Sequence, residues 1–414
     1  MAKKSVVVLG AGFGGLRAAI DVAKGLRQWK LTGKYEVALI DRNDCHLFVP
    51  LLYKVAASPD PQHEMNCTYG IRQLIAGLPI RFVQAEVAAV DCAGGTVTLA
   101  SGDVIHGDYL AVALGSETNF FGIPGLKENA LQLRSLESAM AIRAALAAAF
   151  AKSGEVKVIA GGGGPNGIEL AAEIREWADR EERVNPGLHV SVSIIEAMPG
   201  ILTGFDAGAV AMAEARLEKL GVALRLNAKI TAVAPQEISI ADGTPDGAKV
   251  PFDVFIWTGG LRNPDLLASL PGEKDRHGKP MPQGDMQLAP AVYGIGDNVC
   301  YMDAKTGRPV PAVAHAAILE GGIAARNIIE EIKRVEFSSH NLLPITYSPR
   351  AYPYVIPIGG HWALAKIGPF IFGGWPGWEF SRLVELNYLS MIMPPWRAWK
   401  TWRGHSGRSL DKKV

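Results

Sequence analysis

The stretch Val6-Val7-Val8-Leu9-Gly10-Ala11-Gly12-Phe13-Gly14-Gly15, close to the N-terminus, decides the fold. Four apolar residues of strand type lead into Gly-x-Gly-x-x-Gly, and a helical pattern of apolar residues follows over residues 16–26. This order predicts a buried parallel strand, a tight turn and a helix whose free N–H groups bind a pyrophosphate. A second strand over residues 35–40 ends in Asp41, whose carboxylate can accept hydrogen bonds from ribose hydroxyls.

The same pattern occurs a second time in the chain. A strand over residues 156–160 runs into Gly162-Gly163-Gly164-Pro165-Asn166-Gly167, a helix follows, and a strand over residues 190–195 ends in Glu196. Two complete fingerprints predict two dinucleotide-binding domains. Each second strand ends in an acid and no basic residue directly follows Glu196, so the sequence favours NADH over NADPH.

Composition excludes several classes of protein. The 414 residues suggest two to three domains, and a net charge of +1 gives no indication of a nucleic-acid partner. No apolar run reaches the roughly 18 residues of a membrane-spanning helix, and the run after Met1-Ala2-Lys3-Lys4 is too short for an export signal. The cysteines contain no Cys-x-x-Cys pair, so neither a metal site nor a disulfide framework is expected; they are Cys45, Cys67, Cys92 and Cys300.

Further elements are expected between and after the two fingerprints. Residues 81–87 and 96–99 read as strands of a hairpin that turns at Gly94-Gly95, and residues 138–151 read as a helix. Buried strands precede Gly115 and Gly259-Gly260. The strand over residues 291–295 leads into Gly296-Asp297, where an aspartate at a strand end can hold the ribityl–phosphate part of a flavin, and a helix follows over residues 313–333.

The last 70 residues differ in character, because they contain six of the nine tryptophans. Trp396, Trp399 and Trp402 are spaced to form a stripe on one helix, beside arginine and lysine. Aromatic residues flanked by cations are typical of interfacial membrane helices. The alternative is a helix that packs on the body of the protein or at a dimer contact.

With both fingerprints, Gly296-Asp297 and this C-terminus, the chain resembles the type II NADH:quinone oxidoreductases. These are single-chain, non-proton-pumping, FAD-containing NADH dehydrogenases of the two-dinucleotide-binding-domain flavoprotein superfamily. The stretches that carry the resemblance are residues 41–43, 46–48, 50–53, 162–169, 256–262 and 295–297. The resemblance implies an α/β fold with two Rossmann-like domains, a FAD domain split in sequence by an inserted NADH domain, and a C-terminal membrane-associating region. The expected boundaries are 1–118 and 285–338 for FAD, 119–284 for NADH, and 339–414 for the C-terminal region.

The resemblance also implies a function and a set of site residues. The expected reaction is FAD-dependent oxidation of NADH with two-electron transfer to a membrane quinone, at the cytoplasmic side of the cell membrane, by a peripheral protein. Glu169, placed between nicotinamide and flavin, and His315 are the expected catalytic residues. FAD is expected at Gly10, Gly12, Phe13, Gly14, Gly15, Asp41, Arg42, His46, Gly115, Gly296, Asp297 and Ala314. NADH is expected at Gly162, Gly164, Pro165, Asn166, Gly167, Glu169, Glu196, Gly259 and Gly260, and quinone at Pro50, His315, Ile318 and Leu319.

The chain departs from the family at the helix that follows Gly296-Asp297. The family usually carries Ala-Gln and then further glutamines, whereas this chain has Ala314-His315-Ala316-Ala317-Ile318-Leu319-Glu320. We expect His315 to orient the quinone carbonyl and donate a proton to it, with Glu320 as a relay. The alternative for His315 is a structural hydrogen bond to backbone, and His46 likewise fits either a ligand contact or a loop contact.

Other functions share the architecture and remain open at this point. Sulfide:quinone oxidoreductases and disulfide reductases need cysteines close to the flavin, but Cys45 has no partner at Pro50 and Cys300 is single. A reductase of a soluble electron-transfer protein is the main enzymatic alternative. A non-catalytic NAD(H)-sensing flavoprotein is the non-enzymatic one. The sequence also leaves open whether the chain forms a homodimer.

Overall fold

Strand β1 (Lys4–Leu9) lies near the middle of a six-stranded sheet and pairs in parallel with strands on both sides. The structure is a computed structural model that describes residues 3–60, 62–243, 247–338, 343–349 and 353–407. Val6 to Leu9 are fully buried, as expected for a parallel strand covered on both faces. In spatial order the sheet contains β20 (Gln287–Ala289), β21 (Val292–Gly294), β9 (Tyr109–Val112), β1, β2 (Tyr35–Asp41) and β5 (Ile80–Gln84).

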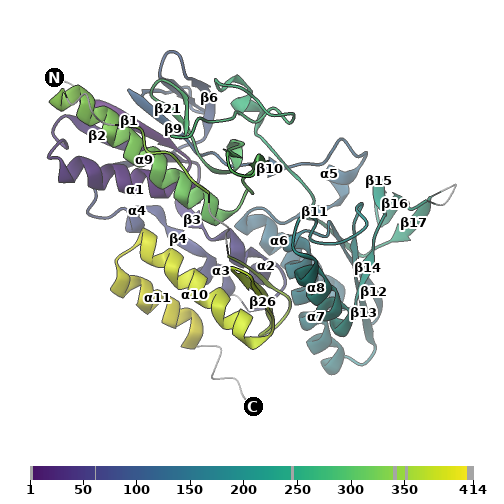
Figure 1. The fold of residues 1–414 in the computed structure, drawn as a ribbon. Helices are drawn as coiled ribbons and strands as arrows, with labels where there is room; N and C mark the ends of the chain where they lie inside the picture. Colours follow the sequence, from purple (N-terminus) through teal and green to yellow (C-terminus); the bar gives the residue numbers. More distant parts are fainter. Residues whose placement is uncertain (1–2, 61, 244–246, 339–342, 350–352, 408–414) are drawn as a thin grey trace.

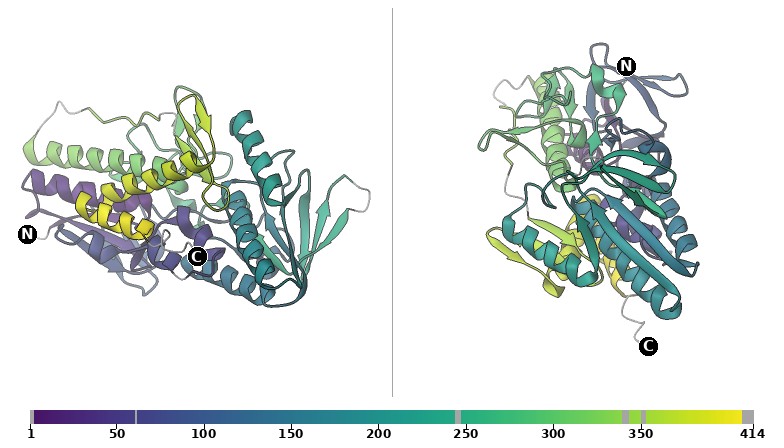
Figure 2. Two further views of the ribbon diagram at one scale, coloured as in Figure 1. Left: turned by 90° about the horizontal axis from the view of Figure 1, so that it is seen from below. Right: turned by 90° about the vertical axis from the view of Figure 1, so that its right-hand side faces the viewer.

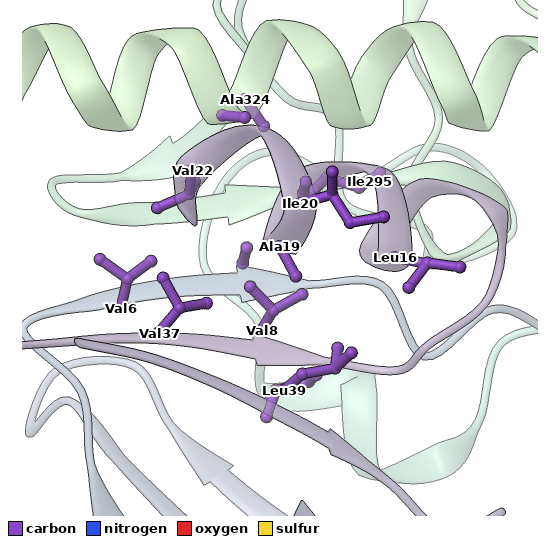
Figure 3. Close-up of a cluster of buried hydrophobic side chains, with 14 of the residues drawn as sticks. Val6, Val8, Leu16, Ala19, Ile20, Val22, Val37, Leu39, Ile295 and Ala324 are labelled. Carbon is purple, nitrogen blue, oxygen red and sulfur yellow. The ribbon is translucent and has the colours of Figure 1, made fainter. Parts of the chain in front are cut away.

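Two helices that are far apart in sequence cover one face of this sheet. Helix α1 (Phe13–Gln28) packs on the strands, and helix α9 (Ala314–Phe337) lies against α1 (Figure 1). Figure 3 shows Ala19 of α1 above Val8 of the sheet and Ile20 beside Ile295, all within one buried apolar cluster. A Cβ added to Gly321 of α9 would overlap the carbonyl oxygen of Gly14, so glycine is required for this close approach. The start of α9 is thereby fixed beside the first glycine-rich loop.

A second parallel sheet contains the second fingerprint. Its strands, in spatial order, are β11 (Leu131–Gln132), β18 (Val254–Trp257), β12 (Gly154–Gly161), β13 (Leu188–Ile195) and β14 (Val222–Arg225). Helices α6 (Leu136–Phe150), α7 (Pro165–Val184) and α8 (Ala207–Leu220) belong to this domain. The strands β20 and β21 return to the first sheet after the second is complete. The fold is therefore α/β with two Rossmann-like domains, the first split by the second.

The domains are joined by a short ribbon of β10 (Glu117–Thr118) and β19 (Leu261–Arg262). Leu267 and Leu270 already pack in the core of the first domain, so the chain returns there earlier than the boundary expected near residue 284. The expected hairpin is wrong in one strand. Residues 80–84 form β5 in the main sheet, and a separate strand, β6 (Val87–Asp91), pairs with β7 (Thr96–Leu99). The reason is that the chain leaves the main sheet where the Ala85 N–H bonds to the Asp41 carbonyl.

The C-terminal region contacts both domains. A small antiparallel sheet of β24 (Tyr354–Pro357), β25 (Ala363–Ile367) and β26 (Phe370–Phe372) packs on the second domain, with Ile356 and Leu364 in its core. Helices α10 (Trp375–Ile392) and α11 (Pro395–Gly407) pack on the first domain through Leu389 and Ala398. Figure 2 shows both contacts from below. Within the described residues, no helix combines the length and the apolar character needed to cross a membrane.

The remaining elements are short connections and small sheets. They are β3 (Cys45–Leu47), η1 (Val49–Leu51), α2 (Leu52–Ala56), α3 (Gln62–Cys67), β4 (Thr68–Gly70), α4 (Ile71–Leu74), β8 (Val104–His106), α5 (Leu126–Asn129), β15 (Lys229–Ala234), β16 (Glu237–Ala241), β17 (Ala248–Pro251), η2 (Asp265–Ser269), η3 (Gly296–Asn298), β22 (Met302–Asp303) and β23 (Arg308–Pro309).

Candidate active site

One cavity of about 2180 Å³ extends between the two domains and along helix α10. Its walls come from the first glycine-rich loop, the second glycine-rich loop, α2, the start of α9 and one face of α10. Single-ligand pockets usually measure roughly 300–1,000 Å³. The cavity is therefore large enough for more than one bound molecule.

The first glycine-rich loop leaves room for a ligand at its middle glycine. A Cβ added to Gly10 would overlap the carbonyl oxygen of Ala113, and one added to Gly15 would overlap the carbonyl oxygen of Gly10. A Cβ added to Gly12 would meet no protein atom within 4 Å. Because Gly12 directly precedes the N-terminus of α1, the open space lies where free helix N–H groups can bind phosphate. The loop thus fits a dinucleotide.

The second glycine-rich loop has the same design. A Cβ added to Gly167 would overlap the carbonyl oxygen of Gly162, whereas one added to Gly164 would meet nothing within 4 Å. Gly164 precedes Pro165, the first residue of α7, and proline at this position loses no intrahelical hydrogen bond. The second loop therefore offers a second phosphate-binding helix terminus.

The acid that ends each second strand braces its own loop. The Asp41 carboxylate accepts hydrogen bonds from the backbone N–H groups of Ala11 (2.7 Å) and Asn43 (2.8 Å). The Glu196 carboxylate accepts from the N–H groups of Gly163 (2.6 Å) and Met198 (2.8 Å). Carboxylate oxygens have further acceptor capacity, so the expected ribose contacts remain predictions compatible with this geometry.

Asp297 is tied to a network that sequence reasoning missed. One of its oxygens accepts a hydrogen bond from the Ser116 hydroxyl (2.8 Å), and Arg134 donates to both the carbonyl and the hydroxyl oxygen of Ser116. Lys279 donates to the Asp297 carbonyl (2.7 Å). Ser116 directly follows the predicted Gly115, so position alone could have suggested it. Arg134 lies between β11 and α6 of the second domain, and no sequence motif marks it.

Two carboxylates line the cavity on α7. Glu169 and Glu173 are one helical turn apart, and burial raises the pKa of each, most strongly for Glu169. Lys54, at the end of the Pro50–Tyr53 motif, also lines the cavity and opposes this rise in pKa. Only Glu169 of this group was predicted. The three side chains thus bring ionisable groups to the wall of the cavity near the two loops.

His315 is the second residue of α9, half-buried, and it lines the cavity as predicted. Burial lowers the pKa of its imidazole, so the ring is mainly neutral at pH 7. Glu320 has a different role from the expected relay. Its carboxylate is 4% exposed, accepts a hydrogen bond from the Gly296 N–H (2.7 Å) and does not line the cavity. Glu320 therefore does not serve as the expected proton relay to His315.

Most of the predicted site residues face this one cavity. Those that line it are Gly10, Gly12, Phe13, Gly14, Asp41, Arg42, Pro50, Gly115, Gly164, Pro165, Asn166, Glu169, Gly296, Asp297, Ala314, His315 and Ile318. Those that do not are Gly15, His46, Gly162, Gly167, Glu196, Gly259, Gly260 and Leu319. Several of the second group shape the loops from behind: Gly15 and Gly167 allow helix and strand to approach, and Glu196 braces Gly163.

Two dinucleotide loops that face a shared cavity, with an aspartate turn at the end of the first sheet, define a two-domain oxidoreductase of the flavin and pyridine-nucleotide class. The chain belongs to the pyridine nucleotide-disulphide oxidoreductase family, which it matches over residues 4–321. All four cysteines are free thiols in the structure.

Several known proteins are similar over nearly the whole chain. A type II NADH:quinone oxidoreductase of Mycobacterium tuberculosis is 28% identical over 410 residues, which cover 93% of this chain and 83% of that protein. The demethylphylloquinone reductase of Synechocystis is 26% identical over 415 residues, which cover 95% and 98%. The solved structure of NDH2 from Plasmodium falciparum in complex with NADH has a TM-score of 0.80, covers 97% of both chains and is 17% identical, a likeness that shows the fold.

Proposed function

We propose that this chain is an NADH:quinone oxidoreductase that binds FAD at the first loop and NADH at the second and passes two electrons to a membrane quinone. The observation that carries the proposal is the single cavity that connects both loops with α9 and α10. The two relatives named for quinone reduction match 93% and 95% of the chain and support the same assignment. When bound, FAD supplies the two-electron chemistry between a hydride donor and a quinone.

The protein's own residues bind, orient and supply protons. The loop N–H groups at Gly12 and Gly164, where the protein leaves open space, would bind the two pyrophosphates, and Asp297, held by Ser116, would bind the flavin side chain. Oxidation of NADH by quinone consumes one proton in addition to the hydride. Glu169 and Glu173 line the cavity, and burial raises the pKa of each carboxyl, most strongly that of Glu169, so protonation there is favoured over that of an exposed glutamate. His315 donates a hydrogen bond to the quinone oxygen, where negative charge develops.

We also propose that the protein binds to the cytoplasmic face of a membrane through α11. On α11, Trp396 is 71% exposed and Trp399 49% exposed, with Lys400 and Arg403 on the same exposed face. Exposed aromatic residues beside cations bind the headgroup region of anionic bilayers. Trp375, which is 62% exposed, also lines the cavity, so the cavity reaches the surface at the base of α10. A quinone dissolved in lipid can enter there.

The decisive experiment separates the two half-reactions. NADH is added anaerobically to the FAD-loaded protein, and bleaching of flavin absorbance is followed. Short-chain quinone, or a soluble iron–sulfur protein in a parallel sample, is then added, and recovery of absorbance is measured. The proposal requires bleaching by NADH and rapid recovery with quinone. Recovery with the iron–sulfur protein alone would establish the soluble-acceptor alternative, and no recovery with either would favour an NAD(H)-sensing role.

A further inference from the structure

We propose that His46 and Tyr388 are positioning residues through which the C-terminal helix α10 fixes the conformation of the first glycine-rich loop and thereby sets the affinity for FAD. The inference rests on the proposed function only in taking FAD as the ligand of that loop. It arises from two buried side chains that the mechanism above does not use.

The two side chains form a continuous hydrogen-bonded chain from α10 to the loop. The Nδ1 atom of His46 lies 2.8 Å from the carbonyl oxygen of Ala11, and its Nε2 atom lies 2.5 Å from the Tyr388 hydroxyl. His46 is 1% exposed and Tyr388 is 4% exposed. The contacts therefore lie in the protein interior, where an unpaired polar group is costly.

The groups at the two ends of this series of hydrogen bonds determine where its protons lie. The Ala11 carbonyl can only accept, so Nδ1 of His46 carries the proton and donates. In a neutral ring Nε2 is then an acceptor, so the Tyr388 hydroxyl donates to it. Burial lowers the pKa of His46 to about 4 and raises the pKa of Tyr388, so both groups stay neutral at physiological pH. The order of donors is therefore Tyr388 to His46 to Ala11.

These hydrogen bonds orient the peptide group between Ala11 and Gly12, at the proposed phosphate site. The Ala11 carbonyl and the Gly12 N–H belong to one planar trans peptide, so they point in opposite directions. With the carbonyl held against the buried His46 ring, the Gly12 N–H points the opposite way, and a Cβ on Gly12 itself would meet no protein atom within 4 Å. The Ala11 N–H is held separately by Asp41. Both polar groups of Ala11 are thus fixed by side chains before any ligand binds.

Aromatic packing strengthens the same connection. The rings of Phe13 and Tyr388 are 4.9 Å apart, and the rings of Phe48 and Tyr388 are stacked at 5.2 Å. Phe13 is the first residue of α1 and lines the cavity. Tyr388 therefore supports the loop at Ala11 and the following helix terminus at Phe13. A well-formed loop before binding increases affinity because less ordering is required.

The test is FAD titration of the flavin-free protein, with Kd read from the quenching of flavin fluorescence. Tyr388→Phe keeps the ring and removes the hydroxyl. Tyr69→Phe is the matched control, because Tyr69 is buried beside the same His46 ring, but its hydroxyl donates to the Asn66 carbonyl (3.1 Å). We expect Tyr388→Phe to weaken FAD binding roughly tenfold, the effect of about 1.4 kcal/mol, and Tyr69→Phe to leave Kd within about twofold. The Tm of each flavin-free variant is measured in parallel.

A second pair of variants keeps the proposal testable if one protein is unstable. His46→Gln retains a donor for the Ala11 carbonyl, so it should lose less affinity than His46→Leu. In the double variant His46→Leu/Tyr388→Phe the losses of FAD affinity should not be additive, because both changes interrupt the same series of hydrogen bonds. An unchanged Kd in Tyr388→Phe, or an equal loss in Tyr69→Phe at equal Tm, would overturn the proposal. A wild-type protein that binds no FAD would instead refute the proposed function.

Discussion

Lys366 of the C-terminal sheet forms an ion pair with Asp206 at the start of α8, and its ammonium nitrogen lies 2.7 Å from both carboxylate oxygens. Asp206 occupies the N-cap position of α8 but makes no side-chain cap bond, because its carboxylate also accepts from the Tyr354 hydroxyl (3.1 Å). The Asp206 carboxylate thus contacts the C-terminal region and does not cap its own helix. The pair therefore joins the β24–β26 sheet to the second domain, which we propose binds NADH.

We predict that Lys366→Met lowers the Tm of the protein at pH 7 and slows flavin reduction by NADH a few-fold, because the NADH domain is held less firmly at its hydride-transfer position. Hydrogen bonds from Lys366 and Tyr354 lower the pKa of Asp206, so their stabilisation is present above the ordinary aspartate pKa of about 3.9 and is lost as pH falls through the lower folded value. Thermal melts from pH 7 downward should show the Tm difference between wild type and variant shrinking only below about pH 4. Lys249→Met, which breaks an ion pair inside the NADH domain, is the control that should not slow flavin reduction.

A second prediction concerns Glu320. Burial raises the pKa of this carboxyl to about 7 in the folded protein, so folding is favoured when it is protonated. The contribution of the protonated Glu320 carboxyl to the free energy of unfolding is fully present below the unfolded pKa of about 4.3. This contribution, on the order of 3 kcal/mol in total, is lost as pH rises toward 7. Glu320→Gln can still accept from the Gly296 N–H and does not ionise. Denaturant unfolding of the flavin-free proteins should therefore show the variant gaining on wild type between pH 5 and pH 8. Parallel pH profiles would contradict this.

A third prediction concerns nicotinamide specificity at Glu196. Its charge repels a 2′-phosphate, so wild type should prefer NADH, and Glu196→Gln should raise kcat/KM for NADPH relative to NADH by roughly tenfold. Glutamine is chosen because it can still accept a hydrogen bond from Gly163 N–H and preserve the loop. Steady-state kinetics with both cofactors give the ratio. Equal use of NADPH and NADH by the wild-type protein would show that Glu196 does not select the cofactor.

A fourth prediction concerns membrane binding. Trp396→Ser/Trp399→Ser should abolish sedimentation with anionic vesicles while FAD content stays normal, because both side chains are exposed on α11. Binding of wild type should weaken as salt screens Lys400 and Arg403. Trp29→Ser, which removes a 41% exposed tryptophan directly after the end of α1, is the control. Removal of residues 390–414 is a poor test, since Ile392 and Ala398 are buried in the first domain's core.

The last prediction concerns His315. Flavin reduction by NADH should stay near the wild-type rate in His315→Ala and His315→Gln, whereas reoxidation by quinone should slow, roughly 100-fold in Ala and less in Gln. Burial lowers the pKa of His315 below its ordinary value of about 6.5. The ratio of the reoxidation rate of wild type to that of His315→Gln should therefore grow as pH falls below about 6.5. Stopped-flow absorbance resolves both half-reactions. Unchanged reoxidation in both variants would assign His315 a structural role only.

The sequence was sufficient for features that depend on a few consecutive residues. Both glycine-rich loops and the helix that begins at Ala314 could be located because turn geometry and helical periodicity are local. The groups assembled by tertiary contacts could not. Tyr388 lies 342 positions from His46, and Arg134 reaches Ser116 from a connection that has no motif. The resemblance implied a contact of His46 with FAD, whereas in the structure its ring bonds to the Ala11 carbonyl and does not line the cavity.

The split first domain has a consequence for the order in which the chain can fold during synthesis. Strands β11 to β18 are contiguous, so the second domain can fold as soon as residue 257 has emerged from the ribosome. The first sheet cannot be completed until β21 has been synthesised. The surface of α1 that packs against α9 stays exposed until α9 has been synthesised as well. The support that Tyr388 gives to the phosphate loop arrives later still. We therefore expect FAD to bind only after nearly the whole chain has been synthesised. A nascent chain truncated after the second domain should contain that domain in folded form and no bound flavin.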